Sequence, residues 1–209
     1  MTDRLNRLIP FTGFLFVVLV VVGGPVLEGS TPGRGASAQH VMAFYADHRA
    51  RERGAAFVLA FAFVAFMLFA AALRDRWRRF EHADGAATLL LVAAGVLAVG
   101  QTLSAGVGYA LADDPARLTP AAAQTLNLLA NDLVLTSGAG FFLFGLCAGA
   151  IILRGVAFPK WLGWLALAMG LLFVLPPIEP LGFVLLLVWC VAVSVGMLRQ
   201  GRRPQPALA

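Results

Sequence analysis

Residues 54–73 read GAAFVLAFAFVAFMLFAAAL and carry no charged side chain. A helix of this length rises about 30 Å, which matches the thickness of the hydrocarbon core of a bilayer. Arginines flank the stretch on both sides, with RARER at 49–53 before it and RDRWRR at 74–79 after it. The stretch therefore predicts a membrane-spanning helix.

The rest of the chain repeats this pattern. Five further apolar blocks alternate with short polar connectors, at residues 8–27, 86–112, 133–153, 161–174 and 181–198. The chain is 60% hydrophobic and only 13% charged, whereas soluble domains have about 25% charged residues. We predict an all-α fold, a polytopic transmembrane helix bundle of six spans. It forms a single membrane domain over residues 1–209, with a flexible tail at 199–209.

The first apolar block has two interpretations. Ala36, Ser37 and Ala38 have the small-x-small form of a signal-peptide cleavage site. However, the apolar core of the block is long, and its distance from Ala38 is about twice what the usual layout of a signal peptide allows. We therefore favour a retained helix at 8–27 and keep cleavage as the alternative.

Basic residues are divided unequally between the two sets of connectors. Of the 16 lysines and arginines, 11 lie at residues 1–7, 74–85, 154–160 and 199–209. Basic loops remain in the cytoplasm under the positive-inside rule, so both termini are predicted to be cytoplasmic. The net charge of +5 reflects these clusters beside apolar blocks, and nucleic acid is not expected as a partner.

Residues 39–53, QHVMAFYADHRARER, form the one amphipathic and ionisable segment of the chain. Val41, Phe44, Tyr45 and His48 recur at the spacing of one helix face, and Ser37 is a plausible N-cap. The segment is predicted on the outer side of the membrane. Orientation does not require its arginines there, so they call for another explanation.

The first candidate site lies in this segment and consists of Tyr45, Asp47, His48, Arg49, Arg51 and Arg53. Guanidinium groups bind phosphate and carboxylate through paired hydrogen bonds, which suggests a site for an anionic lipid or a carboxylate. In the alternative interpretation, the segment is an interfacial helix whose arginines reach lipid headgroups.

A second candidate site is formed by polar residues at membrane depth. These are Gln101, Tyr109, Asn127, Asn131, Asp132 and Thr136. Polar side chains within spans are costly and often functional, and antiparallel packing would bring them to one level. They are expected either to line a small outward-facing polar cavity or to form hydrogen bonds between helices.

No metal, cofactor or catalytic residue is predicted. His40 and His48 are eight residues apart and lie about 80° apart around a helix, so they do not chelate as an i, i+4 pair would. Cys147 and Cys190 both fall within apolar blocks and are expected to be buried thiols. Nucleophile, phosphate-loop and dinucleotide motifs are absent from the sequence.

Small residues recur at four-residue spacing in two of the blocks. Gly100, Ser104 and Gly108 form one such row, and Gly145 and Gly149 form another. This spacing allows helix backbones to approach closely. The rows mark either contacts within the bundle or, for Gly145 and Gly149, a surface for a partner.

Two short motifs resemble those of a known group of proteins. Tyr45-Ala46-Asp47-His48-Arg49 follows the first span, and Pro159-Lys160-Trp161-Leu162-Gly163-Trp164 opens the fifth. With the six-span layout, they resemble a widespread family of uncharacterised bacterial integral membrane proteins. The resemblance implies six helices in the cytoplasmic membrane, and it implies no established activity.

Three functions remain open from the sequence. The first is a non-enzymatic membrane module that binds a lipid, a small molecule or a partner subunit. The second is a small transporter or channel-like protein, which would form homo-oligomers and would show a polar cavity beside a broken helix. The third is an enzyme acting on a lipid, with His48 as the base and the arginines holding phosphate.

Overall fold

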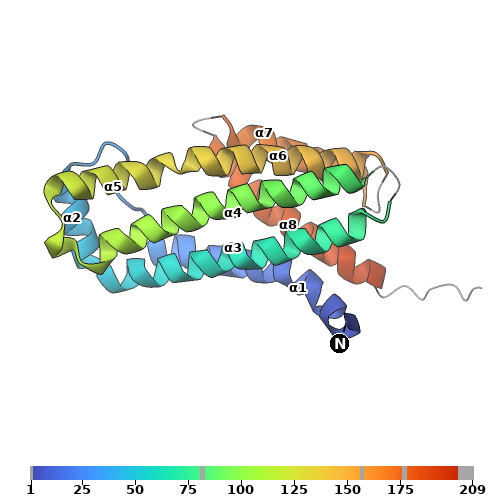
Figure 1. Ribbon diagram of the computed structural model, residues 1–209, viewed down its shortest axis with the longest axis horizontal. Helices are drawn as coiled ribbons and strands as arrows, with labels where there is room; N and C mark the ends of the chain where they lie inside the picture. Colours follow the sequence, from blue (N-terminus) through green and yellow to red (C-terminus); the bar gives the residue numbers. More distant parts are fainter. Residues whose placement is uncertain (1, 81–82, 156–157, 176–177, 202–209) are drawn as a thin grey trace, which may run out of the picture.

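The computed structural model describes residues 2–80, 83–155, 158–175 and 178–201, and these residues contain helices and no strand (Figure 1). The long elements are α1 (Thr2–Val21), α3 (Arg49–Trp77), α4 (Asp84–Asp113), α6 (Val134–Leu153), α7 (Lys160–Phe173) and α8 (Glu179–Gly201). The others are the π-helical η1 (Val22–Glu28), α2 (Ala38–Asp47), the 3-10 turn η2 (Pro115–Arg117) and α5 (Pro120–Asp132).

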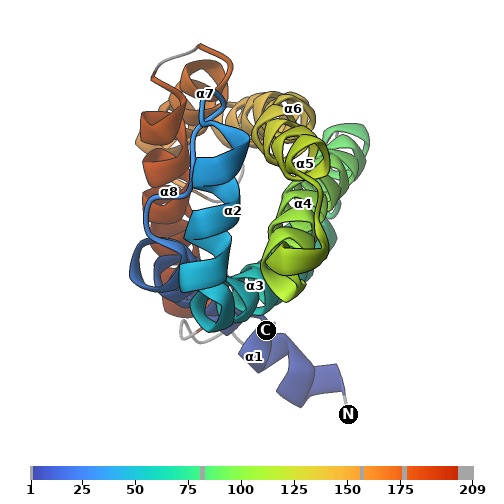
Figure 2. The same cartoon turned by 90° about the vertical axis from the view of Figure 1, so that its left-hand side faces the viewer.

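Six helices form a closed ring. Going round it, α1 packs against α3, α3 against α4, α4 against α6, α6 against α7, α7 against α8, and α8 against α1. Figure 2 shows this ring along its axis, with α2 crossing one side and α5 continuing α6. We call the end covered by α2 and α5 the capped end. The opposite end, where α3 finishes with Arg74, Arg76, Arg78 and Arg79, is the basic end.

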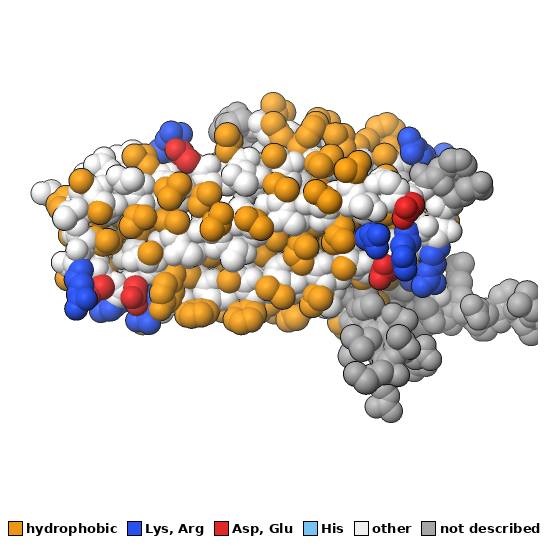
Figure 3. Space-filling model, viewed as in Figure 1, with side chains coloured by type: hydrophobic (Ala, Val, Ile, Leu, Met, Phe, Trp, Pro, Cys, Tyr) orange, Lys and Arg blue, Asp and Glu red, His pale blue; other side chains and the backbone are white. Residues whose placement is uncertain are grey.

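Among the described residues, five helical segments are long and apolar enough to cross a bilayer. They are Pro10–Glu28, Arg49–Trp77, Asp84–Asp113, Pro120–Leu153 and Glu179–Gln200. Figure 3 shows hydrophobic side chains over the middle of one face and charged ones toward both ends. The predicted all-α fold is thereby confirmed, and these apolar helices are compatible with a multi-pass membrane protein. The remaining predicted span, 161–174, forms α7, which at 14 residues rises only about 21 Å and is not among the five.

The segment 39–53 does not form one helix. The backbone of His48 departs from helical geometry, with φ −111° and ψ 15°, so α2 ends before it and α3 begins after it. Arg49, Arg51 and Arg53 therefore belong to the first turns of α3, ahead of the predicted start at 54. The predicted cap is confirmed, because the Ser37 hydroxyl accepts a hydrogen bond from the His40 amide at 3.3 Å.

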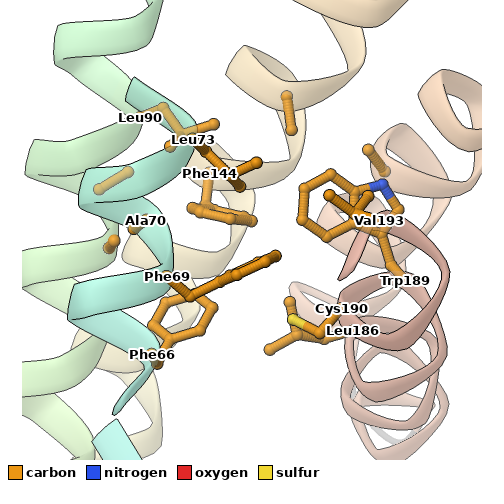
Figure 4. Packing of buried hydrophobic residues seen from close by; sticks show 14 of the residues in the cluster. Phe66, Phe69, Ala70, Leu73, Leu90, Phe144, Leu186, Trp189, Cys190 and Val193 are labelled. Carbon is orange, nitrogen blue, oxygen red and sulfur yellow. The ribbon is translucent and has the colours of Figure 1, made fainter. Parts of the chain in front are cut away.

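An aromatic cluster fills the ring toward the basic end (Figure 4). The ring centroids of Phe66 and Phe144 are 5.2 Å apart, and those of Phe144 and Trp189 are 5.6 Å apart. Phe69 meets Trp189 edge-on. The indole N–H of Trp189 donates to the Leu162 carbonyl at 3.0 Å, which satisfies the polar group of a buried tryptophan. The cluster joins α3, α6, α7 and α8.

Small residues allow the close approach of helices that was predicted at Gly100, Gly145 and Gly149, but not at Gly108, where a Cβ would meet no atom within 4 Å. A Cβ atom on Gly145 would lie 2.5 Å from the Ala166 carbonyl oxygen, and one on Gly100 would lie 3.0 Å from the Ser137 backbone nitrogen. A Cβ on Gly149 would meet the Leu167 side chain at 2.6 Å. Gly145 and Gly149 are therefore contacts of α6 with α7, and they are not exposed for a partner.

Candidate functional site

Arginines at the start of α3 tie that helix to the end of α4. The Arg53 guanidinium donates to the Tyr109 hydroxyl at 3.1 Å, lies 3.5 Å from the Asp113 carboxylate, and sits over the Tyr109 ring. Arg49 donates to the Asp113 carbonyl oxygen. Both guanidinium groups therefore have acceptors within the protein.

Two further arginines hold the connector between η1 and α2. Arg51 lies 3.4 Å from the Glu52 carboxylate and 3.5 Å from the Glu28 carbonyl oxygen. Arg34 pairs with Asp132 of α5 at 3.2 Å, with both side chains exposed. In this arrangement, all four arginines connect helices at the capped end.

His48 lies at the junction of α2 and α3, where it contacts its own segment. Its ring stacks on Phe44 with centroids 4.6 Å apart, and its Nδ1–H donates to the Phe44 carbonyl at 2.9 Å. The hydrogen bond of its ring is thus made to the backbone. Tyr45, the next residue after Phe44, is buried on the side that faces the bundle.

A cavity of about 310 Å³ lies between the helices, open to the surface, at the level where α7 ends and α8 begins. Its walls come from α1, η1, α3, α4, α7 and α8. The lining residues are Val20, Gly24, Pro25, Glu28, Leu59, Phe63, Gln101, Phe173, Glu179, Pro180 and Phe183. Because α7 rises about 9 Å less than a bilayer core is thick, it ends before the longer helices around it and leaves this space open.

The lining of this cavity is mainly apolar and includes two carboxyl groups. Phe63, Phe173 and Phe183 supply aromatic surface, while Glu28 and Glu179 supply the acidic groups and Gln101 an amide. Its lining residues include no lysine, arginine or histidine. The cavity therefore offers two carboxyl groups and aromatic faces to whatever enters it.

A smaller polar cavity of about 90 Å³ lies next to it and shares Glu28. Its lining residues are Glu28, Thr31, Tyr45, Ser104, Gly108, Asn127, Ala130 and Asn131. Hydrogen bonds orient three of them: Asn127 donates to the Gly33 carbonyl at 3.1 Å, Asn131 to the Asn127 carbonyl at 2.8 Å, and Ser104 to the Ala130 carbonyl at 3.2 Å. Glu28 thus stands between an apolar and a polar compartment.

Burial raises the pKa of the Tyr45 hydroxyl above its ordinary value, and the charges of Glu52 and Glu28 raise it further. The unfolded chain releases this proton near pH 10 while the folded chain retains it, so stability should fall as pH rises above about 10. We expect Tyr45→Phe to reduce this loss. Chemical unfolding of the wild type and the variant at pH 9 and pH 11 measures the free energy of unfolding. An equal decrease between the two pH values in both proteins would contradict the expectation.

The two predicted sites contribute unequally to these cavities. Tyr45 and Asn131 line the smaller cavity, and Gln101 lines the larger one. Arg49, Arg51, Arg53 and Tyr109 form the ties between helices, while Asp132 pairs with Arg34 at the surface. His48 lines neither cavity.

Sequence reasoning did not select the two carboxylates of the larger cavity. Glu28 directly follows the first apolar block, three residues after Pro25, and Glu179 precedes Pro180. A carboxylate close to a helix-breaking residue at the end of a span was the available signal. With spans predicted at 8–27 and 181–198, both residues fall in connectors.

In the described part of the chain, the His, Cys, Asp and Glu side chains form no group of three or more that could hold a metal ion. Cys147 and Cys190 are buried free thiols, as expected. Comparison of the chain with protein-family models, curated proteins and solved structures finds no match.

Proposed function

We propose that this protein is an integral membrane module that binds a small organic cation in the larger cavity. The observation that carries the proposal is the pairing of Glu28 and Glu179 with an aromatic wall that has no basic side chain. Carboxylates in apolar surroundings need a compensating charge, and aromatic faces attract cations, quaternary ammonium groups above all. A volume of about 310 Å³ is at the lower end of the range for ligand pockets.

The proposal includes a membrane orientation. All six apolar blocks would cross the cytoplasmic membrane of a bacterium, as in the family that the sequence resembles, with both termini inside. This orientation is supported by the 11 of 16 basic residues on one set of connectors, and by α1 beginning and α8 finishing toward the basic end (Figure 1). The shorter α7 would span with help from its connectors or from local thinning of the bilayer.

Cation binding is tested with benzyltrimethylammonium, which combines a quaternary ammonium group with an aromatic ring. We expect the protein in nanodiscs to bind this probe, and Glu28→Gln or Glu179→Gln to weaken binding about tenfold, because each removes one charge-assisted contact of roughly 1.5 kcal/mol. Isothermal titration calorimetry at constant ionic strength measures the affinity.

Two controls separate this site from general attraction of cations. Asp84→Asn removes the same charge from an exposed residue at the start of α4 and should leave the affinity unchanged. Benzenesulfonate, an anion with a similar ring, should not bind. Equal affinity for both probes, or unchanged binding in both glutamate variants, would refute the proposal.

Transport of such a cation is the second candidate. The observation that favours it is the broken helix beside the cavity, where η1 is π-helical and contains Pro25 within the first apolar block. Transporters form their ligand sites at discontinuous helices. Uptake of radiolabelled benzyltrimethylammonium into proteoliposomes tests this candidate. Binding without uptake would contradict transport and would favour a module that binds the cation without moving it.

The enzyme hypothesis gains no comparable support. His48, its expected base, donates to a backbone carbonyl. The arginines that were expected to hold phosphate already contact acceptors within the protein. A lipid substrate would have to displace these ties between helices before it could be bound.

A further inference from the structure

The basic end contains a second cleft, remote from the cation cavity. Its volume is about 270 Å³, and it lies between α1, α3 and α8. Pro10 of α1 and Met197 of α8 form apolar walls, while Arg76 at the end of α3 and Arg78 and Arg79 in the turn after it supply guanidinium groups. Figure 3 shows basic side chains gathered at this end of the bundle.

The positive charge of this cleft is only partly compensated. Its one acidic lining residue, Asp75, is shared between Arg78 at 3.3 Å and Arg74 at 3.5 Å. Arg76 donates to the neutral amide oxygen of Gln200. Arg79 has no hydrogen bond or ion pair with the described residues, and it lies close enough to Arg76 for the two charges to repel.

The arginines of the capped end show the opposite arrangement. Arg34, Arg51 and Arg53 each lie within 3.5 Å of a carboxylate, and Arg49 donates to a backbone carbonyl. Their charges are used to hold helices together. At the basic end, by contrast, Arg76 lies in the last turn of α3 and Arg79 in the turn that follows it. Both line the same cleft, and neither has an ion pair with a carboxylate among the described residues.

The cleft also lies at the boundary between apolar and polar surface. Arg76 is half-buried and Arg79 is exposed, whereas Ala72, one turn earlier on α3 and also in the cleft, is buried. A phospholipid has the same order of apolar and charged groups, because its acyl chains lie next to its glycerol phosphate. Guanidinium groups bind phosphate oxygens through paired hydrogen bonds, and basic pockets between spans bind anionic headgroups.

We propose that Arg76, Arg78 and Arg79 form a phosphate-binding cleft, whose occupant is an anionic phospholipid with its acyl chain against Pro10 and Met197. The proposal is independent of cation binding at the capped end. A soluble phosphate would present the same chemistry to the guanidinium groups, and the two sources are distinguished by experiment.

The first experiment tests binding of a lipid. The full chain is mixed with equal amounts of phosphatidylglycerol and phosphatidylcholine, and native mass spectrometry measures the ratio of the two lipids that remain bound. We expect the wild type to retain phosphatidylglycerol preferentially. The double variant Arg76→Gln, Arg79→Gln should abolish most of this preference. Each arginine near the membrane surface is expected to contribute a factor of about five to the bound ratio. Arg79→Gln alone should lose about fivefold, and it breaks no contact among the described residues.

The matched control is Arg154→Gln, which removes an exposed arginine that follows α6 and does not line the cleft. It should keep the full preference for phosphatidylglycerol. An equal loss in this variant would show general charge attraction and overturn the proposal, as would an unchanged preference in Arg79→Gln.

The second experiment tests binding of a soluble phosphate. Inorganic phosphate is added to the protein in phosphatidylcholine nanodiscs, and the thermal stability of the protein is measured. Stabilisation of the wild type but not of the double variant, without a preference for phosphatidylglycerol, would support the cleft and assign it to a free phosphate. Absence of both the lipid preference and this stabilisation would overturn the proposal.

Discussion

Replacing Gly145 by valine is expected to lower the free energy of unfolding by about 3 kcal/mol, the upper end of the usual cost of overpacking. Already its Cβ would lie 2.5 Å from the Ala166 carbonyl oxygen and 2.9 Å from the Gly170 Cα. These obstacles are backbone atoms, so no side chain can rotate to make room. The helices α6 and α7 would have to separate, and contacts along their whole interface would weaken.

Gly106→Val is the matched control for this prediction. Gly106 lies in the long helix α4, and a Cβ there would meet no atom within 4 Å. Its replacement should therefore change stability by less than about 0.5 kcal/mol, as surface substitutions do. Unfolding in mixed micelles with increasing sodium dodecyl sulfate measures both variants. Similar losses for the two would show that the close approach of α6 to α7 does not limit stability.

Removing the Arg51 guanidinium is expected to cost about 2 kcal/mol, because it leaves a buried carboxylate without its partner. Glu52 is only 4% exposed, while Arg51 is 42% exposed and lies 3.4 Å away. Breaking a fully buried pair costs about 3–5 kcal/mol and an exposed pair about 0–1 kcal/mol, so this half-exposed pair falls between. Arg51→Ala also removes the contact with the Glu28 carbonyl that holds η1 against α3.

A double variant separates these two effects. Arg51→Ala with Glu52→Gln removes the stranded charge, so it should recover at least half of the lost stability. Arg117→Ala breaks an exposed pair with Asp114 and should cost less than about 1 kcal/mol. The free energy of unfolding is measured for the wild type, Arg51→Ala, the double variant and Arg117→Ala. A double variant no more stable than Arg51→Ala would mean that burial of the Glu52 charge is not the source of the loss.

Helix positions could be predicted from the sequence because they depend on neighbouring residues. The apolar runs, the Ser37 cap and the Thr119 cap before Pro120 are all local patterns, and the Thr119 hydroxyl accepts from the Ala122 amide at 3.2 Å. The division of 39–53 at His48 was not predicted. The helical pattern of α2 and the arginines of α3 are continuous in the sequence, and the break becomes evident only where α2 packs against α5.

Some of the polar residues selected from the sequence line cavities, as Gln101 and Asn131 show. Their part in binding a ligand stays a prediction. The arginines were expected to point to lipid or to an anion, but several acidic residues and carbonyl groups lie within their reach. Which acceptor an arginine meets depends on how α3, α4 and η1 are placed, and sequence spacing carries no information on that placement.

The sequence by itself determined that the chain is a bundle of apolar helices suited to a membrane, because about 20 uncharged residues in a row have no other stable environment on this scale. The tertiary structure decided where the bundle is hollow and which charges face the hollow. Glu28 and Glu179 are 151 positions apart in the chain, and both line one cavity. The reason is the shortness of α7: it rises about 9 Å less than a bilayer core is thick, and residues at its end and at the start of α8 line the open space between the longer helices.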